Sequence, residues 1–332
     1  MSKKLQPLRI GDLIIDIPLI QGGMGVRVSA SSLASAVSNE GALGVIASVG
    51  LGEEWPDKSI DYRTRSELGF KKVIRDTQSL TKRPFGVNIM CALTNYDSLV
   101  RIADEEGVDA IISGAGLPLA LPSLVRNSRT KLLPVISSAR AAELVCRSWL
   151  RRYDRLPDGI VLEGPLAGGH LGFSMTELEC VDELRLSCLL PDVLGVVRVY
   201  EETANKPIPV VVAGGVWDGK DIAKMLTLGA SGVQMATRFV GTNECDAHHA
   251  YKEAFLNANP EDIIVMDSPV KMPIRVIKNA FVEQVWAGEK VPFKCTFHCL
   301  KTCKPKEVKY CIAQALINAY RGNLNEGFAV CG

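Results

Sequence analysis

Short apolar runs alternate with amphipathic stretches along the first 257 residues of the chain. Each run is three to five residues long, and most are rich in valine, isoleucine and leucine. Runs of this kind predict β-strands that are buried on both faces, as in a parallel sheet covered by helices. The predicted strands are Pro18–Ile20, Leu43–Ala47, Phe85–Ile89, Ala110–Ile112, Leu132–Ile136, Ile160–Leu162, Val210–Val212 and Gly232–Met235.

The stretches between most of these runs have the apolar spacing of an amphipathic helix. Capping side chains such as Ser138 and Asp218 mark helix starts, and glycines such as Gly41 and Gly107 mark helix ends. Residues 51–66 are polar and irregular, and we expect them to form a loop over one end of the fold. The predicted helices run from Ser31 or Ser32 to Asn39, Glu67 to Leu80, Asp97 to Glu106, Ser138 to Tyr153, Asp218 to Gly229 and Asp246 to Leu256.

The strand count separates two α/β architectures. Eight strands favour a closed (β/α)₈ TIM barrel, whereas an open doubly wound sheet would carry G-x-G-x-x-G after its first strand. The sequence QGGMGVR at 21–27 does not have that spacing. We therefore predict a TIM barrel over residues 1–257.

The alternation stops beyond Asn257. Residues 260–304 contain proline, glycine and cysteine with little periodicity, and a terminal helix is predicted from Glu307 to Tyr320. Residues 258–332 have too few apolar positions to form a core of their own. We therefore expect an irregular and helical extension that packs on the barrel as part of the same domain.

Composition excludes several classes of partner. The net charge is +1 and no basic stretch is interleaved with aromatic residues, so a nucleic-acid partner is not expected. No apolar run approaches the roughly 20 residues of a membrane span, and the first residues lack a hydrophobic signal core. Ten cysteines without an export signal are expected to be reduced thiols of a cytoplasmic protein. The sequence leaves the oligomeric state open, a homodimer included.

Small and polar residues follow the last two predicted strands. The loops after strands seven and eight of such barrels commonly bind a phosphate through backbone N–H groups. The alternative is that these glycines only form tight turns. The candidate phosphate-binding residues are Gly214, Gly215, Gln234, Ala236 and Thr237.

The sixth strand ends in a glycine run followed by a histidine. Gly168 and Gly169 leave the backbone bare, which lets a flat ligand lie against it. His170 could act as a general acid or base, since imidazole titrates near neutral pH, or it could be a hydrogen-bonded structural residue. Glu163 could orient His170 or bind a ligand hydroxyl, or be a capped and solvated carboxylate. We take His170 as the candidate catalytic residue.

Two further positions on the same rim are ambiguous. Gln21, Gly22, Gly23 and Met24 follow the first strand, where backbone could lie against a flat ring system. Asn88 ends the third strand inside an apolar run, and its buried amide needs a partner, either a ligand or neighbouring backbone.

Four cysteines occur close together in the extension. Cys295, Cys299 and Cys303 are four residues apart, which would place them on one face of a helix, and Cys311 follows. The spacing fits neither the usual zinc pattern nor a ferredoxin run. The sequence therefore favours reduced thiols packed as small apolar groups over a metal centre.

Six motifs in order resemble the nitronate monooxygenase family, formerly the 2-nitropropane dioxygenases, and their relatives the flavin-dependent enoyl-acyl-carrier-protein reductases. The resemblance extends from about residue 8 to 285 and, more weakly, through the terminal helix. The motifs are IQGGMG at 20–25, PFGVNIM at 84–90, SGAGLP at 113–118, EGPLAGGHLG at 163–172, VVAGGVWDG at 211–219 and GVQMATRFVGTNEC at 232–245.

The resemblance implies a barrel that binds FMN noncovalently. Gln21, Gly22, Gly23 and Met24 would lie along the isoalloxazine with Asn88 and Gly169 near it, and His170 matches the active-site histidine of the family. The phosphate would be bound by Gly214, Gly215, Gln234, Ala236 and Thr237. The chain departs from the family at Leu166, where many members have a carboxylate, and at Ala236, where glycine is common.

Three functions follow from this resemblance. The first is oxidation of an alkyl nitronate by O2 to a carbonyl compound and nitrite, with His170 as base or anion stabiliser. The second is reduction of an enoyl thioester by NAD(P)H through FMN, since PFGVNIM and IRVIKN at 274–279 resemble the reductase branch equally well. The third is a non-catalytic flavin protein whose tail cysteines sense redox state.

Overall fold

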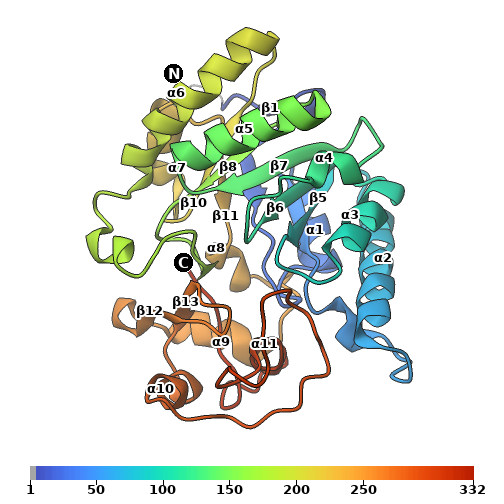
Figure 1. Ribbon diagram of the computed structural model, residues 1–332, viewed down its shortest axis with the longest axis vertical. Helices are drawn as coiled ribbons and strands as arrows, with labels where there is room; N and C mark the ends of the chain where they lie inside the picture. The colour runs from blue at the N-terminus through green and yellow to red at the C-terminus, as the bar shows by residue number, and fades with distance from the viewer. Residues whose placement is uncertain (1–4) are drawn as a thin grey trace.

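The computed structural model describes residues 5–332 and contains an eight-stranded parallel barrel (Figure 1). The strands pair in the order β3-β11-β10-β8-β7-β6-β5-β4, and a parallel bridge between Ile20 and Leu43 joins the two ends. The predicted TIM barrel is therefore confirmed. Its strands are β3 (Leu19–Gln21), β4 (Gly44–Ala47), β5 (Phe85–Met90), β6 (Ala110–Gly114), β7 (Lys131–Ile136), β8 (Ile160–Glu163), β10 (Val210–Ala213) and β11 (Gly232–Met235).

Helices cover the outer face of the barrel. Asp61, Ser138 and Asp218 cap α2, α5 and α7 through their side chains, as expected for N-cap residues. The helices of the barrel region are α1 (Ser31–Asn39), α2 (Tyr62–Leu80), α3 (Tyr96–Glu105), α4 (Leu121–Leu124), α5 (Ala139–Tyr153), α6 (Leu186–Ala204), α7 (Gly219–Thr227), α8 (Thr237–Val240) and α9 (His249–Asn257), with 3₁₀ turns at η1 (Leu51–Glu54) and η2 (Glu177–Cys180).

Two helix boundaries differ from the sequence prediction. Helix α2 begins at Tyr62, so the last part of the predicted 51–66 loop is helical. Helix α9 begins at His249, three residues after the predicted start at Asp246. The Asp246 carboxylate instead accepts backbone hydrogen bonds from Ala30, Ser32 and Leu33 around the start of α1.

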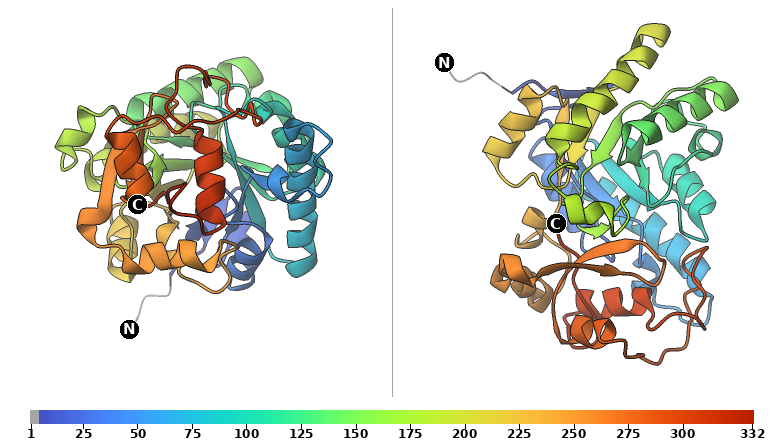
Figure 2. Two further views of the ribbon diagram at one scale, coloured as in Figure 1. Left: turned by 90° about the horizontal axis from the view of Figure 1, so that it is seen from below. Right: turned by 60° about the vertical axis from the view of Figure 1, so that its left-hand side comes forward.

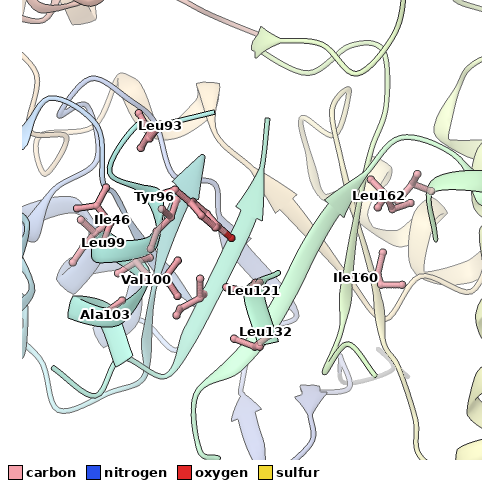
Figure 3. Close-up of a cluster of buried hydrophobic side chains, with 14 of the residues drawn as sticks. Ile46, Leu93, Tyr96, Leu99, Val100, Ala103, Leu121, Leu132, Ile160 and Leu162 are labelled. Atoms are coloured by element: carbon pink, nitrogen blue, oxygen red, sulfur yellow. The ribbon is translucent and has the colours of Figure 1, made fainter. Parts of the chain in front are cut away.

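The main core lies between the sheet and the surrounding helices. Leu99, Val100 and Ala103 of α3 are fully buried in a cluster that also contains Ile46 of β4 and Leu132 of β7 (Figure 3). Burial of apolar surface on this scale is the dominant favourable term in folding. This packing between helices and sheet holds the carboxyl-terminal ends of the barrel strands in place.

A second apolar cluster closes the amino-terminal end of the barrel. Strands β1 (Leu8–Ile10) and β2 (Leu13–Ile15) form an antiparallel hairpin. The alternate side chains of this hairpin pack with inward residues of the barrel such as Val161 and Val211. The hairpin therefore forms the floor of the barrel, at the end opposite the carboxyl-terminal strand tips.

The extension lies across the other end of the barrel (Figure 2). Its first part is not irregular, because β12 (Ile263–Asp267) and β13 (Pro273–Ile277) pair antiparallel and β13 also pairs with β9 (Gly169–His170). This corrects the prediction for residues 260–304. The remaining elements are η3 (Pro260–Asp262), α10 (Ala280–Trp286) and α11 (Ile312–Tyr320), so the terminal helix starts later than the predicted Glu307.

No helix within residues 5–332 is both long and apolar enough to cross a membrane.

Candidate active site

A cavity of about 520 Å³ lies between the carboxyl-terminal strand tips and the extension. Its wall includes residues from the loops after most barrel strands and from β13 and α11. Ligand sites of TIM barrels lie at this end. The predicted site residues that line the cavity are Gly22, Gly23, Met24, Asn88, Gly169, His170, Gly214, Gly215, Gln234, Ala236 and Thr237.

Gln21 is the predicted site residue that the structure does not place on the cavity wall. Its side chain is fully buried, and its Oε1 accepts a hydrogen bond of 3.0 Å from the backbone N–H of Val45. Its Nε2 donates to the carbonyl of Gly22. Gln21 therefore braces β3 against β4 where the barrel closes.

Gly23 and Asn88 pack directly against each other. A Cβ at position 23 would overlap the Cβ of Asn88, so this position needs glycine. The Asn88 amide lines the cavity and has no hydrogen-bond partner within the described residues. Of the two alternatives for Asn88, this placement favours a ligand over neighbouring backbone as the partner.

Two consecutive glycines turn the chain after β10. Gly214 and Gly215 have φ values of +88° and +82°, in the left-handed region that glycine tolerates best. A Cβ on Gly214 would lie 2.8 Å from the backbone nitrogen of Ala167. On the next strand, the Oε1 atom of Gln234 is buried without a partner within residues 5–332. A buried and unpaired amide oxygen beside bare backbone fits a polar ligand group.

Thr237 and Ala236 complete this side of the cavity. Ala236 is the residue before α8, and Thr237 is its first residue. The Thr237 hydroxyl accepts a hydrogen bond of 3.0 Å from the backbone N–H of Gly332, which also lines the cavity. The segment that ends at Gly332 thus forms part of the wall next to the candidate phosphate-binding residues.

His170 is held at the cavity by a strand and by one hydrogen bond. In the short strand β9 it pairs with Ile274 of β13. Its Nε2 atom lies 3.0 Å from the hydroxyl oxygen of Ser268, a buried residue in the turn between β12 and β13. Burial lowers the pKa of His170 to about 4, so the imidazole is neutral at pH 7. Nδ1 has no hydrogen-bond partner in the described part of the chain.

Glu163 is a carboxylic acid on the cavity wall whose pKa burial shifts upward, whereas burial lowers the pKa of His170. It ends β8, lines the cavity, and forms no hydrogen bond or ion pair through its side chain among the described residues. Burial raises the pKa of this carboxyl to about 7. Glu163 and His170, the first and last residues of the EGPLAGGH motif, are not hydrogen-bonded to each other, so Glu163 does not orient His170.

Sequence reasoning missed two polar residues of the cavity region. Ser268 contacts His170 although 98 positions separate them. Arg275 lines the cavity, donates a hydrogen bond of 2.7 Å from Nη2 to the carbonyl of Pro165, and has a buried Nε without a partner in residues 5–332. The motif IRVIKN contains Arg275 and was the available signal, whereas no local pattern singles out Ser268.

A flavin fits this arrangement in two respects. Gly22, Gly23 and Gly169 offer bare backbone on which a flat ring can lie, and the buried amide oxygen of Gln234 needs a polar partner. The model of the nitronate monooxygenase family matches residues 7–97 and 90–332, and the chain belongs to this family. With the closed barrel and this cavity, the family membership defines the protein as a flavin-dependent oxidoreductase.

Its relatives carry different names. A (3aS,4S,5R,7aS)-5-hydroxy-7a-methyl-1-oxo-octahydro-1H-indene-4-carboxyl-CoA dehydrogenase of Mycobacterium tuberculosis is 30% identical over 83% of this chain and 67% of its own length. A probable nitronate monooxygenase of Staphylococcus aureus is 26% identical over 82% of this chain and 78% of its own. The structure of FabK from Thermotoga maritima superimposes with a TM-score of 0.73 at 29% identity, covering 96% of this chain and 86% of that one.

Proposed function

We propose that this protein is an FMN-dependent nitronate monooxygenase that converts alkyl nitronates and O2 to carbonyl compounds and nitrite. The observation that carries the proposal is His170, a buried and neutral imidazole on the wall of a cavity at the strand tips of a flavin barrel. Membership of the nitronate monooxygenase family supports the same reaction. When bound, FMN supplies the two-electron chemistry between the nitronate and O2.

The residues that would hold FMN divide into two groups. Gly22, Gly23, Met24, Asn88 and Gly169 would lie along the isoalloxazine, where bare backbone and one amide face the cavity. The phosphate would be bound by the loops after β10 and β11, where Gln234 has an unpaired amide oxygen that can also bind a ribityl hydroxyl. The phosphate-binding set is Gly214, Gly215, Gln234, Ala236 and Thr237.

The pKa of His170 bears on how it acts. An imidazole whose pKa is about 4 is a weak base at neutral pH and is poorly suited to remove a proton from carbon. In the tautomer in which Nε2 accepts from the Ser268 hydroxyl, the proton of the neutral ring resides on Nδ1. Nδ1–H can donate a hydrogen bond to an anionic nitronate oxygen, which makes His170 an anion stabiliser and favours nitronates over neutral nitroalkanes as substrates.

Anaerobic mixing of the yellow protein with propyl-2-nitronate tests this proposal. We expect rapid bleaching of the flavin absorbance, and indifference to NADPH under the same conditions. Adding O2 after bleaching should restore the flavin colour and release nitrite and acetone. A flavin that stays oxidised with propyl-2-nitronate would overturn the proposal.

The second candidate is a reductase of enoyl thioesters that uses NAD(P)H. It is supported by the likeness to FabK over 96% of the chain and by a relative whose name specifies a carboxyl-CoA compound. In this reaction His170 would polarise the thioester carbonyl through the same Nδ1–H donor. Rapid bleaching by NADPH, followed by reoxidation with crotonyl-CoA, would favour this reaction over nitronate oxidation.

A non-catalytic redox sensor is the third candidate. Sensor thiols need a lowered pKa, because the thiolate is the reactive form. Burial instead raises the pKa of Cys299 to about 12 and also raises the pKa values of Cys303 and Cys311. Only a yellow protein that turns over with neither nitronates nor NADPH would support this function.

A further inference from the structure

The cavity wall is apolar where the extension meets the loops after β3, β4 and β5 (Figure 2). None of the residues proposed to hold FMN belongs to this part of the lining. Helix α11 supplies two of its side chains, the segment between α10 and α11 supplies one, and the three barrel loops supply the others. We call the six side chains Val26, Val49, Leu93, Leu300, Ala313 and Leu316 the apolar wall.

Helix α11 packs against the loops after β3 and β4. Val26 and Ala313 belong to one buried cluster, and Val49 and Leu316 pack against it. A Cβ at position 50 would overlap the side chain of Val26, so Gly50 lets the two loops lie in direct contact. These contacts hold four of the six wall residues next to one another on the cavity.

The loop after β5 holds the rest of the apolar wall. Leu93 and Leu300 form an antiparallel bridge, and both side chains are buried. The backbone N–H of Thr94 donates a hydrogen bond of 3.0 Å to the carbonyl of Cys299. The segment between α10 and α11 is therefore tied to the barrel, and the wall is built into the folded chain.

This segment, residues 287–311, contains no helix or strand. Cys295, Cys299 and Cys303 therefore do not lie on one helix face, which corrects the sequence expectation. Cys299 packs as a small apolar group in the cluster of the buried Phe297, and it also lines the cavity. Burial raises the pKa of its thiol to about 12, so this neighbour of the apolar wall is uncharged at pH 7.

The charged side chains of the cavity come from other elements. Among the described residues that line it, the ionisable ones besides Cys299 are Glu163 and His170 after β8, Arg238 on α8 and Arg275 on β13. The apolar wall offers neither a charge nor a hydrogen-bonding side chain. A carboxylate or phosphate placed against it would lose its water without gaining a partner. The wall therefore suits an uncharged hydrocarbon group.

We propose that the substrate carries an unbranched hydrocarbon chain that lies against the apolar wall, and that Ala313 and Leu316 set the preferred chain length. The inference rests on the proposed function and narrows its substrates to nitronates of primary nitroalkanes with chains longer than that of propyl-2-nitronate. Each methylene moved from water onto an apolar surface strengthens binding, by about 4-fold when its burial is complete. The value of kcat/KM should therefore rise with chain length until the wall is covered.

The nitronates of nitroethane, 1-nitrobutane and 1-nitrohexane test the inference on the flavin-loaded wild-type protein. We expect kcat/KM to rise by about 2- to 4-fold per added methylene. The nitronate of 6-nitrohexanoic acid has the same number of carbons as that of 1-nitrohexane but ends in a carboxylate, and its kcat/KM should be about 10-fold lower or less. Equal values across the alkyl series, or a preference for the carboxylate, would overturn the inference.

Leu316→Ala tests the wall itself. It should lower kcat/KM for the nitronate of 1-nitrohexane by about 5- to 10-fold, because part of the chain loses its contact, and leave the value for nitroethane nearly unchanged. Gln314→Ala is the matched control, since Gln314 is exposed on the same helix and does not line the cavity. A hexyl-to-ethyl ratio that stays at the wild-type value in Leu316→Ala would remove Leu316 from chain selection. Should this variant fail to fold, the wild-type series decides the question.

Binding of primary alcohols separates this inference from the proposed reaction. Perturbation of the flavin absorbance by ethanol, butan-1-ol and hexan-1-ol measures Kd without turnover, and we expect Kd to fall by about 2- to 4-fold per methylene. A protein that binds the alcohols in this order but oxidises none of the nitronates would refute the proposed function and support the apolar wall. Kd values that do not depend on chain length would overturn the inference even if nitronates react.

Discussion

The hydroxyl of Ser268 lies 3.0 Å from Nε2 of His170, and this contact joins the turn between β12 and β13 to the strand tip that carries the histidine. The backbone N–H of Val270 donates to the same hydroxyl oxygen at 3.4 Å, so the serine proton can point toward the ring. We therefore expect Ser268 to donate to Nε2 and to favour the tautomer with the proton on Nδ1. It is a positioning residue rather than a catalytic one.

Ser268→Ala is expected to lower kcat/KM for propyl-2-nitronate by about 3- to 10-fold, the value of one hydrogen bond of about 1 kcal/mol. Ser268→Thr keeps the hydroxyl and should restore most of the loss. The flavin content should not change in either variant. Equal rates for the alanine variant and wild type would show that the serine does not position the ring.

His170→Ala should keep FMN and lose most turnover. Removing a donor aimed at developing or existing negative charge costs about 10²–10³ in rate. The measurement is steady-state nitrite formation, with bound flavin determined from the absorbance of the same sample. His249→Ala is a suitable control, because His249 is exposed on α9 and only approaches Glu253. An unchanged kcat would remove the histidine from the mechanism.

Protonation of His170 should not limit activity above about pH 5, because burial lowers its pKa to about 4. An exposed imidazole would instead produce a limb near pH 6.5. The pH dependence of kcat/KM with a preformed nitronate measures this directly. A limb near 6.5 that disappears in His170→Gln would contradict the burial argument.

Glu163 should make the protein less stable as pH rises. Its pKa in the folded protein is about 7, above the ordinary 4.5, so the folded state holds a proton that the unfolded chain has released. This contribution is complete below pH 4.5 and is lost as pH rises through 7. Glu163→Gln should therefore unfold like wild type near pH 4 and be more stable at pH 8, by on the order of 2 kcal/mol. Urea unfolding at both pH values tests the difference.

Gly23→Ala should abolish flavin binding, because the added Cβ would overlap Asn88 on the cavity wall. Gly195→Ala is the contrasting substitution, since Gly195 lies within α6 and a Cβ added there would have no other atom within 4 Å. It should retain flavin and gain about 0.5–1 kcal/mol in stability. Flavin content after gel filtration distinguishes the two variants, and a yellow Gly23→Ala protein would show that the wall can shift.

The barrel could be predicted because each of its strands is buried on both faces and is therefore a short, continuously apolar run in the sequence. The long helix α6 was not predicted, since Pro191 and Gly195 interrupt its pattern and only tertiary packing favours the helix. Strands β12 and β13 were missed for a related reason. Their alternation is weak, and their pairing with β9 becomes evident only when the chain is folded.

The candidate site shows the same division. Glycines and His170 sit at strand tips, and strand tips can be read from sequence because the barrel dictates where they meet. Ser268 and Arg275 reach the cavity from the extension, whose position over the barrel no local pattern encodes. Gln21 belongs to the glycine-rich motif after the first barrel strand, but its side chain turns toward β4. There its amide oxygen accepts a hydrogen bond from the backbone N–H of Val45, where the barrel closes.

The hairpin of β1 and β2 has a kinetic consequence. By filling the barrel floor with Leu8, Ile10, Leu13 and Ile15, it leaves the cavity no passage through the barrel axis. Whatever enters or leaves the cavity must therefore pass at the carboxyl-terminal end of the barrel, beneath the extension. With the proposed function, the nitronate and O2 would both approach from this end, and a high concentration of one is expected to slow the reaction of the other.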